Sequence, residues 1–355
     1  MRRTALGLLF VATACGDNLA PAVTIESTGA AWIATRGAPD QPWVRHDGAR
    51  ARFDADPTGR PYDVVVVCRA DAGEGWALTA GYEDGLAWIR PCATPAVPTV
   101  AVGFDLTSPA DEVRVRDRVG LAPATDVLAV PAGVSDVIAV TGGAGAVDRI
   151  QIQRGLEFTA DRRVALDVAG RGTDLVPVEV TFDGRLPTTA VVRMLTAGGT
   201  AIPLTTTVAR VVPTALVYPG DIQSVEVTLG DAWARAAIDE QAVDLPHPGA
   251  SPRLELSGAA PPTWTWHRVG SFRATLAVIP DGAAAARWTL YAYPTALDAR
   301  TVDGIVTQPL VAPDVAGWDP TWWPSAPYTW LARLTRDRED GGSEGFTTSR
   351  TIAAP

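Results

Sequence analysis

Hydrophobic and polar residues alternate along much of this chain with a period of two. Residues 112–116 and 149–153 alternate strictly, and residues 64–67 are an unbroken run of valines. Successive side chains of a β-strand point to opposite faces, so alternation predicts a strand with one buried face, and an apolar run predicts burial on both. Similar patterns predict strands at 99–102, 164–168, 178–182, 201–204, 224–229, 253–256, 272–278 and 288–293.

Short turn sequences separate the predicted strands, among them Asp47-Gly48, Asp183-Gly184 and Asp281-Gly282. Helical periodicity is weak and confined to residues 231–241 and 283–286. Many short strands with regular turns are typical of β-sandwiches. The sequence therefore predicts an all-β fold of two or three tandem antiparallel β-sandwich domains after a cleaved N-terminal signal.

Clusters of proline divide the chain at residues 93–98 and 211–213. The middle part could be one long meander or two small sheets. The expected organisation is a signal peptide at 1–14, a tether at 15–24, a first β-sandwich domain with a disulfide at 25–97, a second at 98–213 and a tryptophan-rich third at 214–355.

The first fifteen residues have the three parts of a bacterial export signal. Two arginines follow Met1, residues 5–14 are apolar, and Cys15 follows the small residues that end the run. A membrane-spanning helix needs about 20 apolar residues, so this segment is too short to span a bilayer. Ala12-Thr13-Ala14 fits ordinary signal peptidase, which would leave a secreted protein. The same residues resemble a lipobox with Ala12 in place of leucine, which would make Cys15 a lipidation site.

The number of cysteines favours the lipid anchor. The chain has three, Cys15, Cys68 and Cys92, and an odd thiol in an exported protein needs an explanation. If Cys15 carries lipid, Cys68 and Cys92 are free to pair as a disulfide, which an oxidising compartment favours over two buried thiols. Gly16 after the cleavage site makes the outer membrane the expected destination by resemblance to Gram-negative lipoproteins.

Composition excludes one class of partner. The chain has a net charge of −10 and contains no lysine, and its 30 arginines form no cationic run. A nucleic-acid partner is therefore not expected. The expected partners are the membrane, through the lipid anchor, and an envelope protein or polysaccharide.

Motifs that carry chemistry are absent from the sequence. The three histidines are far apart, and residues 54–59 lack the oxygen ligands of a calcium loop, so neither a metal nor a cofactor is expected. Residues 341–345 match G-x-S-x-G, but charged residues precede them and a strand pattern follows, which favours a hairpin tip over a nucleophile elbow. The chain is not predicted to be an enzyme, and a secreted hydrolase without a recognisable motif is the least favoured alternative.

Residues 25–200 resemble a recurrent family of uncharacterised bacterial surface lipoproteins. The resemblance rests on Ala30–Ala34, Trp43, the strand 62–68 and the segment 148–156. Residues 130–139 look like a strand of carboxypeptidase-regulatory-like, transthyretin-type β-sandwiches. The resemblance implies tandem β-sandwich units and transfers no catalytic residue.

Tryptophan is concentrated toward the C-terminal end, where eight of the twelve lie beyond residue 230. Trp264 and Trp266 share one face of a predicted strand, and Trp318, Trp322 and Trp323 lie in a proline-bounded segment. The favoured interpretation is that these rings fill the sandwich core. Exposed rings would instead form a ligand-binding surface, because a flat ring buries much area at low entropic cost.

The sequence as a whole predicts a non-catalytic, lipid-anchored protein of the cell envelope that acts in surface display, adhesion or binding. The alternative is a carbohydrate-binding protein that uses the C-terminal aromatic residues.

Overall fold

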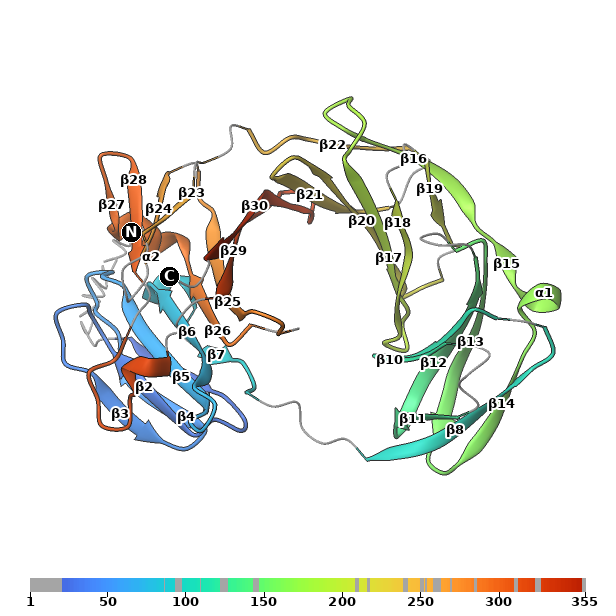
Figure 1. Cartoon of the computed structure of the whole chain (residues 1–355), viewed down its shortest axis with the longest axis horizontal. Coiled ribbons are helices and arrows are strands. Elements are labelled where there is room, and N and C mark those ends of the chain that lie inside the picture. Colours follow the sequence, from blue (N-terminus) through green and yellow to red (C-terminus); the bar gives the residue numbers. More distant parts are fainter. Residues whose placement is uncertain are drawn as a thin grey trace, which may run out of the picture.

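The structure, a computed structural model, describes residues 21–352 except 86, 93–97, 109, 122–126, 143–146, 208–210, 216–217, 239–241, 250–251, 253, 258–262, 269, 284–285, 310–311 and 323–326. Within this part of the chain, strands build six sheets that pack as four β-sandwiches. The four sandwiches lie along an open arc in the order 2, 3, 4 and 1 (Figure 1). The predicted all-β sandwich fold is confirmed. Cys15 and the expected signal peptide lie outside the described residues.

Sandwich 1 packs the sheet β4-β1-β7 against the strands β6-β5-β2-β3. The first strand begins inside the segment expected as a tether, because Val23 and Ile25 alternate with polar residues and are buried in this core. The elements of sandwich 1 are β1 Ala22–Glu26, β2 Trp32–Arg36, β3 Val44–Asp47, β4 Arg50–Asp54, β5 Tyr62–Arg69, β6 Glu74–Ala80, the 3-10 helix η1 Tyr82–Asp84 and β7 Ala87–Ile89.

Sandwich 2 packs the sheet β10-β9-β12-β13-β15 against β11-β8-β14. The short helix α1 follows β14, where the Asp167 carboxylate accepts a hydrogen bond from the Gly170 amide and caps the first turn. The elements of sandwich 2 are β8 Thr99–Leu106, β9 Glu112–Val115, β10 Arg118–Leu121, β11 Val127–Pro131, β12 Gly133–Thr141, β13 Arg149–Phe158, β14 Arg162–Leu166, α1 Val168–Arg171 and β15 Thr173–Asp174.

Sandwich 3 packs β19-β16-β22 against β18-β17-β20-β21. Asp183 and Gly184 form a two-residue turn with positive φ at both positions, and the flanking Phe182 and Arg185 exchange backbone hydrogen bonds. Its strands are β16 Val176–Phe182, β17 Thr189–Leu195, β18 Ala201–Thr207, β19 Val211–Thr214, β20 Ile222–Leu229, β21 Ala232–Ala237 and β22 Ala242–Leu245.

Sandwich 4 packs β23-β24-β28-β27 against β30-β29-β25-β26. Pro294 occupies the first position of α2, where its missing amide hydrogen removes no helical bond. Its elements are β23 Leu254–Ser257, β24 Thr263–His267, β25 Arg273–Pro280, β26 Trp288–Ala292, α2 Pro294–Ala299, β27 Thr301–Val302, β28 Ile305–Pro309, the 3-10 helix η2 Pro320–Trp322, β29 Tyr328–Asp337 and β30 Ser343–Ile352.

Two sequence expectations about these elements are corrected. The sheet β19-β16-β22 takes strands from both sides of residue 213, so hydrogen bonding crosses the division expected there. Residues 98–213 accordingly supply all of sandwich 2 and the first strands of sandwich 3. The weak helical pattern at 231–241 yields β21 instead, because its alternating residues pair with β20 and β30. No helix in the described ranges is long and apolar enough to cross a membrane.

A single sheet of twelve strands runs through sandwiches 3, 4 and 1 in the order β18-β17-β20-β21-β30-β29-β25-β26-β6-β5-β2-β3. Antiparallel pairing of β21 with β30 joins sandwiches 3 and 4. Parallel pairing of β26 with β6 joins sandwich 4 to sandwich 1 and so connects segments far apart in the sequence. Because backbone hydrogen bonds cross both junctions, these three sandwiches are not independent units.

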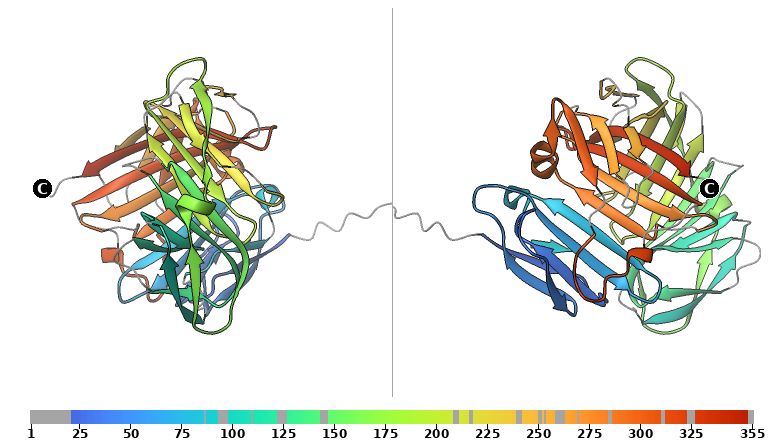
Figure 2. Two further views of the ribbon diagram at one scale, coloured as in Figure 1. Left: turned by 90° about the vertical axis from the view of Figure 1, so that its right-hand side faces the viewer. Right: turned by 60° about the vertical axis from the view of Figure 1, so that its left-hand side comes forward.

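The valine run of β5 is buried on both faces, as its sequence predicts. Val64 and Val66 belong to the core of sandwich 1, whereas Val65 and Val67 belong to the large cluster that contains Trp322. The segment around η2 leaves sandwich 4 and lies on this second face (Figure 2), where the Trp322 and Trp32 rings are 6.2 Å apart. Sandwich 4 therefore completes the burial of a sheet that belongs to sandwich 1.

Candidate functional site

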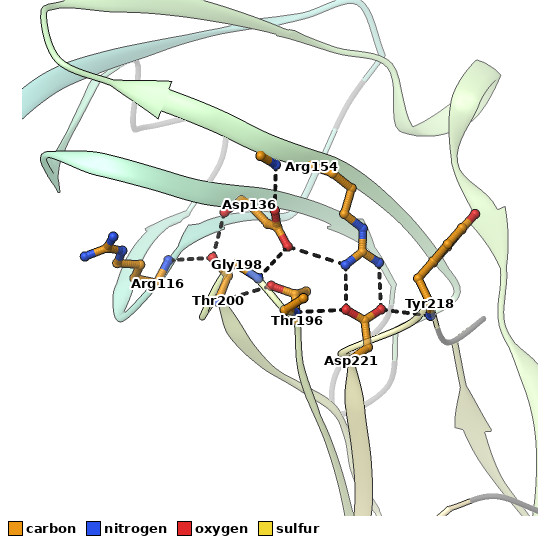
Figure 3. Close-up of polar contacts among 10 residues, drawn as sticks. Arg116, Asp136, Arg154, Thr196, Gly198, Thr200, Tyr218 and Asp221 are labelled. Atoms are coloured by element: carbon orange, nitrogen blue, oxygen red, sulfur yellow. Dashed lines mark hydrogen bonds and ion pairs between the residues drawn. The ribbon is translucent and has the colours of Figure 1, made fainter.

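The junction between sandwiches 2 and 3 contains a buried cluster of two carboxylates and one guanidinium (Figure 3). We name it the Asp-Arg-Asp cluster, and it consists of Asp136, Arg154 and Asp221. Arg154 Nη1 and Nη2 donate to the two Asp221 carboxylate oxygens over 2.5 and 2.7 Å. Arg154 Nη1 also lies 3.4 Å from Asp136 Oδ2. One guanidinium thus holds a carboxylate from each sandwich.

A β-bulge positions two members of the cluster. The register of β12 and β13 shifts between Ser135 and Val137, which places Asp136 at the irregularity. Gly155 on the facing strand has φ 60°, and its amide donates to Asp136 Oδ1 over 2.8 Å. Bulges bend a strand and redirect its side chains. The bulge therefore turns a carboxylate out of the core of sandwich 2 toward its neighbour.

The hairpin loop between β17 and β18 supplies further hydrogen-bond donors to Asp136. The Gly198 amide donates to Asp136 Oδ2 over 3.1 Å, and Thr200 Oγ1 donates to the Asp136 carbonyl over 2.6 Å. A Cβ atom at Gly198 would lie 2.5 Å from Asp136 Oδ1, so only glycine allows this approach. The loop sequence is thus adapted to the carboxylate beneath it.

Both carboxylates have almost no exposed side-chain surface, and both are satisfied by hydrogen bonds. Asp221 accepts from the backbone amides of Ala197 and Tyr218 over 2.9 and 3.1 Å, in addition to Arg154. Such charge-assisted bonds compensate for the loss of hydration when a charge is buried. The cluster therefore fixes sandwich 2 relative to sandwich 3.

The ionisation of the pair follows from these contacts. Burial alone would raise the pKa of Asp221, but the hydrogen bonds from Arg154, Ala197 and Tyr218 outweigh it and hold the pKa below its usual value. The hydrogen bonds to Asp221 raise the pKa of Arg154. Both groups are therefore charged at neutral pH, and the ion pair is intact.

A pocket of about 250 Å³ adjoins the cluster. Strand β13 contributes Ile150, Ile152 and Arg154 to its lining, and Arg171 and Thr173 come from α1 and β15. Tyr218 forms another part of the wall and is 57% exposed. The Arg154 guanidinium carbon lies 4.8 Å from the centre of the Tyr218 ring. The pocket is thus a concave surface built from two neighbouring sandwiches.

The predicted disulfide is confirmed. Cys68 at the end of β5 is bonded to Cys92, which follows β7, with a Cα–Cα distance of 5.1 Å. Ser27 Oγ contacts Cys92 Sγ at 3.2 Å, and the Cys92 amide donates to the Thr28 carbonyl over 2.9 Å. The disulfide therefore links the two sheets of sandwich 1, and Cys92 also ties the end of this sandwich to its first turn.

Three of the candidate ligand-binding tryptophans are core residues. Trp264, Trp266 and Trp322 are only 2%, 3% and 8% exposed. Trp264 packs edge-on against Trp330, with ring centres 4.7 Å apart. Their indoles offer no free face to a ligand, so the favoured interpretation that they fill the core is confirmed, and the alternative of an exposed ligand-binding surface is wrong for these three.

The remaining two candidate tryptophans are Trp318 and Trp323. Trp318 is partly buried and packs edge-on against Trp322 and Trp288, with ring centres 5.2 and 5.5 Å away. Trp323 lies outside the described residues. Trp318 and Trp322 therefore stabilise the cover over sandwich 1, whereas Trp264 and Trp266 belong to sandwich 4 itself.

Residues 341–345 form no nucleophile elbow. Ser343 is the first residue of β30 and pairs with Asp337 across the β29–β30 hairpin, which confirms the predicted hairpin tip. Glu344 is buried and forms an ion pair with Arg336. Within the described ranges, no group of three or more histidine, cysteine, aspartate or glutamate side chains could hold a metal ion.

Sequence reasoning missed the Asp-Arg-Asp cluster. A signal was present, because Asp136 interrupts the apolar strand 133–141 and Arg154 ends the alternating run 149–153. A charge within a buried strand indicates a specific partner. The sequence could not identify that partner, since Asp221 lies 67 positions beyond Arg154.

Comparison with known proteins identified no family for this chain. No family model matches, and no curated protein matches. Among solved structures, the chain was aligned with the four N-terminal Ig domains of Dscam1 isoform 8.4 at 10% identity, covering 96% of this chain and 93% of that one with a TM-score of 0.13. At that TM-score the alignment carries no argument about fold details or function.

Proposed function

We propose that this chain is a non-catalytic, lipid-anchored protein of the bacterial cell envelope, and that its sandwiches form one rigid scaffold for display or binding. The observation that carries the location is the Cys68–Cys92 disulfide. Disulfides persist in oxidising compartments, and this one leaves Cys15 as the single remaining cysteine of the chain. Cys15 is also the residue at which the export pattern places lipid.

The rigid scaffold is supported by the way in which the sandwiches are joined. Domains linked only by small polar contacts move relative to one another by default. Here one sheet passes through three sandwiches, and sandwich 2 is fixed to sandwich 3 by the Asp-Arg-Asp cluster. The same junction is apolar, since Ile138, Val140 and Ile150 share a core cluster with Ile202 and Leu204. A scaffold of this kind suits a protein that holds a binding surface away from a membrane.

The anchor is tested by expression of the full chain in a Gram-negative host with a labelled fatty acid. The wild type is expected to incorporate label and to sediment with the outer membrane. Cys15→Ala is expected to lose both, because stable anchoring needs more than one acyl chain and these are attached through this cysteine. The matched control, Cys68→Ala with Cys92→Ala, keeps Cys15 and is expected to keep its label.

The opposite results would overturn the location. Release of the wild type into the periplasm without label would indicate ordinary signal-peptidase cleavage. Membrane retention of Cys15→Ala at the wild-type level would show that something other than lipid holds the protein.

A further inference from the structure

The pocket beside the Asp-Arg-Asp cluster has the polarity of an anion site. Two of its lining residues, Arg154 and Arg171, are cationic, and Thr173 and Tyr218 add hydroxyl groups. No carboxylate lies among the described lining residues. Ile150 and Ile152 supply an apolar floor. Ligand sites typically combine an apolar surface with a few convergent polar groups.

Arg154 is fixed in place before any ligand arrives. Asp221 holds its guanidinium through two hydrogen bonds, yet 32% of the arginine side chain stays exposed. Tyr218 lies against the guanidinium and keeps more than half of its own surface exposed. A group that is already ordered loses little entropy on binding. This wall is therefore preorganised.

Arg171 supplies the uncompensated charge. It is the last residue of α1, and its amide donates to the Asp167 carbonyl over 2.8 Å, which fixes its backbone. Its side chain is exposed and forms no ion pair with any residue in the described ranges. Arginine binds planar carboxylates through two parallel hydrogen bonds. A carboxylate in the pocket would be its natural partner.

We propose that this pocket binds the carboxylate and ring of one uronic-acid residue of an acidic polysaccharide. Arg171 binds the carboxylate, the Thr173 and Tyr218 hydroxyl groups bind sugar hydroxyls, and the Tyr218 ring with the isoleucine floor covers the apolar face of the sugar. The inference rests on the proposed function and names a ligand class for it.

A peptide fits this surface less well than a sugar. Extended peptides bind by adding a strand to a free sheet edge. The strand beside the pocket, β15, is only two residues long, Thr173–Asp174, and both residues already face β13. It offers too few backbone groups for a peptide strand, whereas a sugar ring needs only the side chains of the pocket.

The test is calorimetric titration of the purified full chain with a galacturonic-acid trimer. The wild type is expected to bind, and the same trimer with its carboxyls reduced to alcohols is expected not to bind. Arg171→Ala is expected to weaken affinity at least about tenfold, because a charge-assisted hydrogen bond is lost. Tyr218→Ala is expected to weaken affinity by a similar factor through loss of the ring face. Arg118→Ala is the matched control, an exposed arginine of the same sandwich outside the pocket, and keeps wild-type affinity.

Several results would overturn the site. Absence of binding by the wild type, equal binding of the reduced trimer, or wild-type affinity of Arg171→Ala would each do so. Binding of a peptide with a free C-terminal carboxylate in place of the trimer would also reject the sugar. Cys15→Ala separates this proposal from the anchor, since a variant that stays on the membrane but binds the trimer rejects only the location, and a variant that leaves the membrane but does not bind the trimer rejects only the pocket.

Discussion

Arg300 donates a hydrogen bond over 3.1 Å to Asp63, a residue 237 positions earlier in the chain whose carboxylate has no exposed surface. Arg36 binds the other oxygen of the same carboxylate over 2.8 and 2.5 Å. Arg300 follows α2 of sandwich 4, whereas Asp63 and Arg36 pair on β5 and β2 of sandwich 1. The contact therefore locks the last sandwich to the first with two arginines around one aspartate, the reverse of the Asp-Arg-Asp cluster.

Asp63→Ala should strongly destabilise the junction of sandwiches 1 and 4. Removal of one partner from a buried ion pair leaves the other charges uncompensated and typically costs about 3–5 kcal/mol. Thr79 Oγ1, which donates to Asp63 over 2.6 Å, would also lose its acceptor. Urea denaturation monitored by tryptophan fluorescence would measure the free energy of unfolding.

Asp337→Ala is the matched control for this prediction. Asp337 also forms a two-bond ion pair with an arginine, Arg273, but both side chains are largely exposed. Exposed pairs contribute less than about 1 kcal/mol. Equal losses in the two variants would contradict the claim that burial makes the Asp63 contact structural.

The alternation of the sequence was sufficient to predict many of the strands and their buried faces, but not β21, whose residues showed a weak helical pattern. It predicted that residues 64–67 are covered on both sides, and Val64 and Val65 indeed belong to different core clusters. Alternation does not identify the neighbour of a strand, because every strand with one apolar face presents the same pattern. The parallel pairing of β26 with β6, and with it the sheet shared by three sandwiches, could not be read from the sequence.

The candidate site was harder to predict for a related reason. The pairing of Cys68 with Cys92 followed from counting thiols, because a disulfide needs only two partners of one kind. Arg154 is one of 30 arginines, and nothing local distinguishes it as the partner of Asp221. The tryptophans were ambiguous because a large ring serves a core and a ligand surface equally well, and burial separates the two uses only in three dimensions.

Acid should weaken the ion pair between Arg154 and Asp221 that connects sandwiches 2 and 3. Because the folded-state pKa of Asp221 lies below its unfolded value, its contribution to stability is present above about pH 4 and is lost as pH falls through the folded-state pKa. At pH 7, Asp221→Asn should lower the free energy of unfolding by about 3 kcal/mol. The difference from wild type should shrink steadily below pH 4. A difference that stays constant from pH 7 to pH 3 would contradict the ionic origin.

Trp322→Ala should destabilise the fold as a core substitution does. The indole lies against Trp32 and Trp318, and a Cβ at Gly73 would come within 2.6 Å of it, so it fills a tightly packed site. Loss of a buried aromatic ring typically costs about 3–5 kcal/mol. Tyr218→Ala removes an exposed ring and should change stability by less than about 1 kcal/mol. Thermal denaturation of both variants would measure the contrast, and an unchanged melting temperature in Trp322→Ala would restore this ring as a surface candidate.

Replacement of Cys68 and Cys92 by serine should destabilise sandwich 1. The bond spans 24 positions, and the entropy of closing such a loop corresponds to about 3.5 kcal/mol. The loss should appear in urea denaturation of the double variant, and a reducing agent should shift the wild type to the same midpoint. The reducing agent should leave the variant unchanged, because no bond remains in it to reduce.

Mass mapping of the oxidised wild type should recover the two cysteines in one linked peptide pair. Two alkylatable thiols in the folded, oxidised protein would contradict both the bond and the argument that leaves Cys15 for lipid.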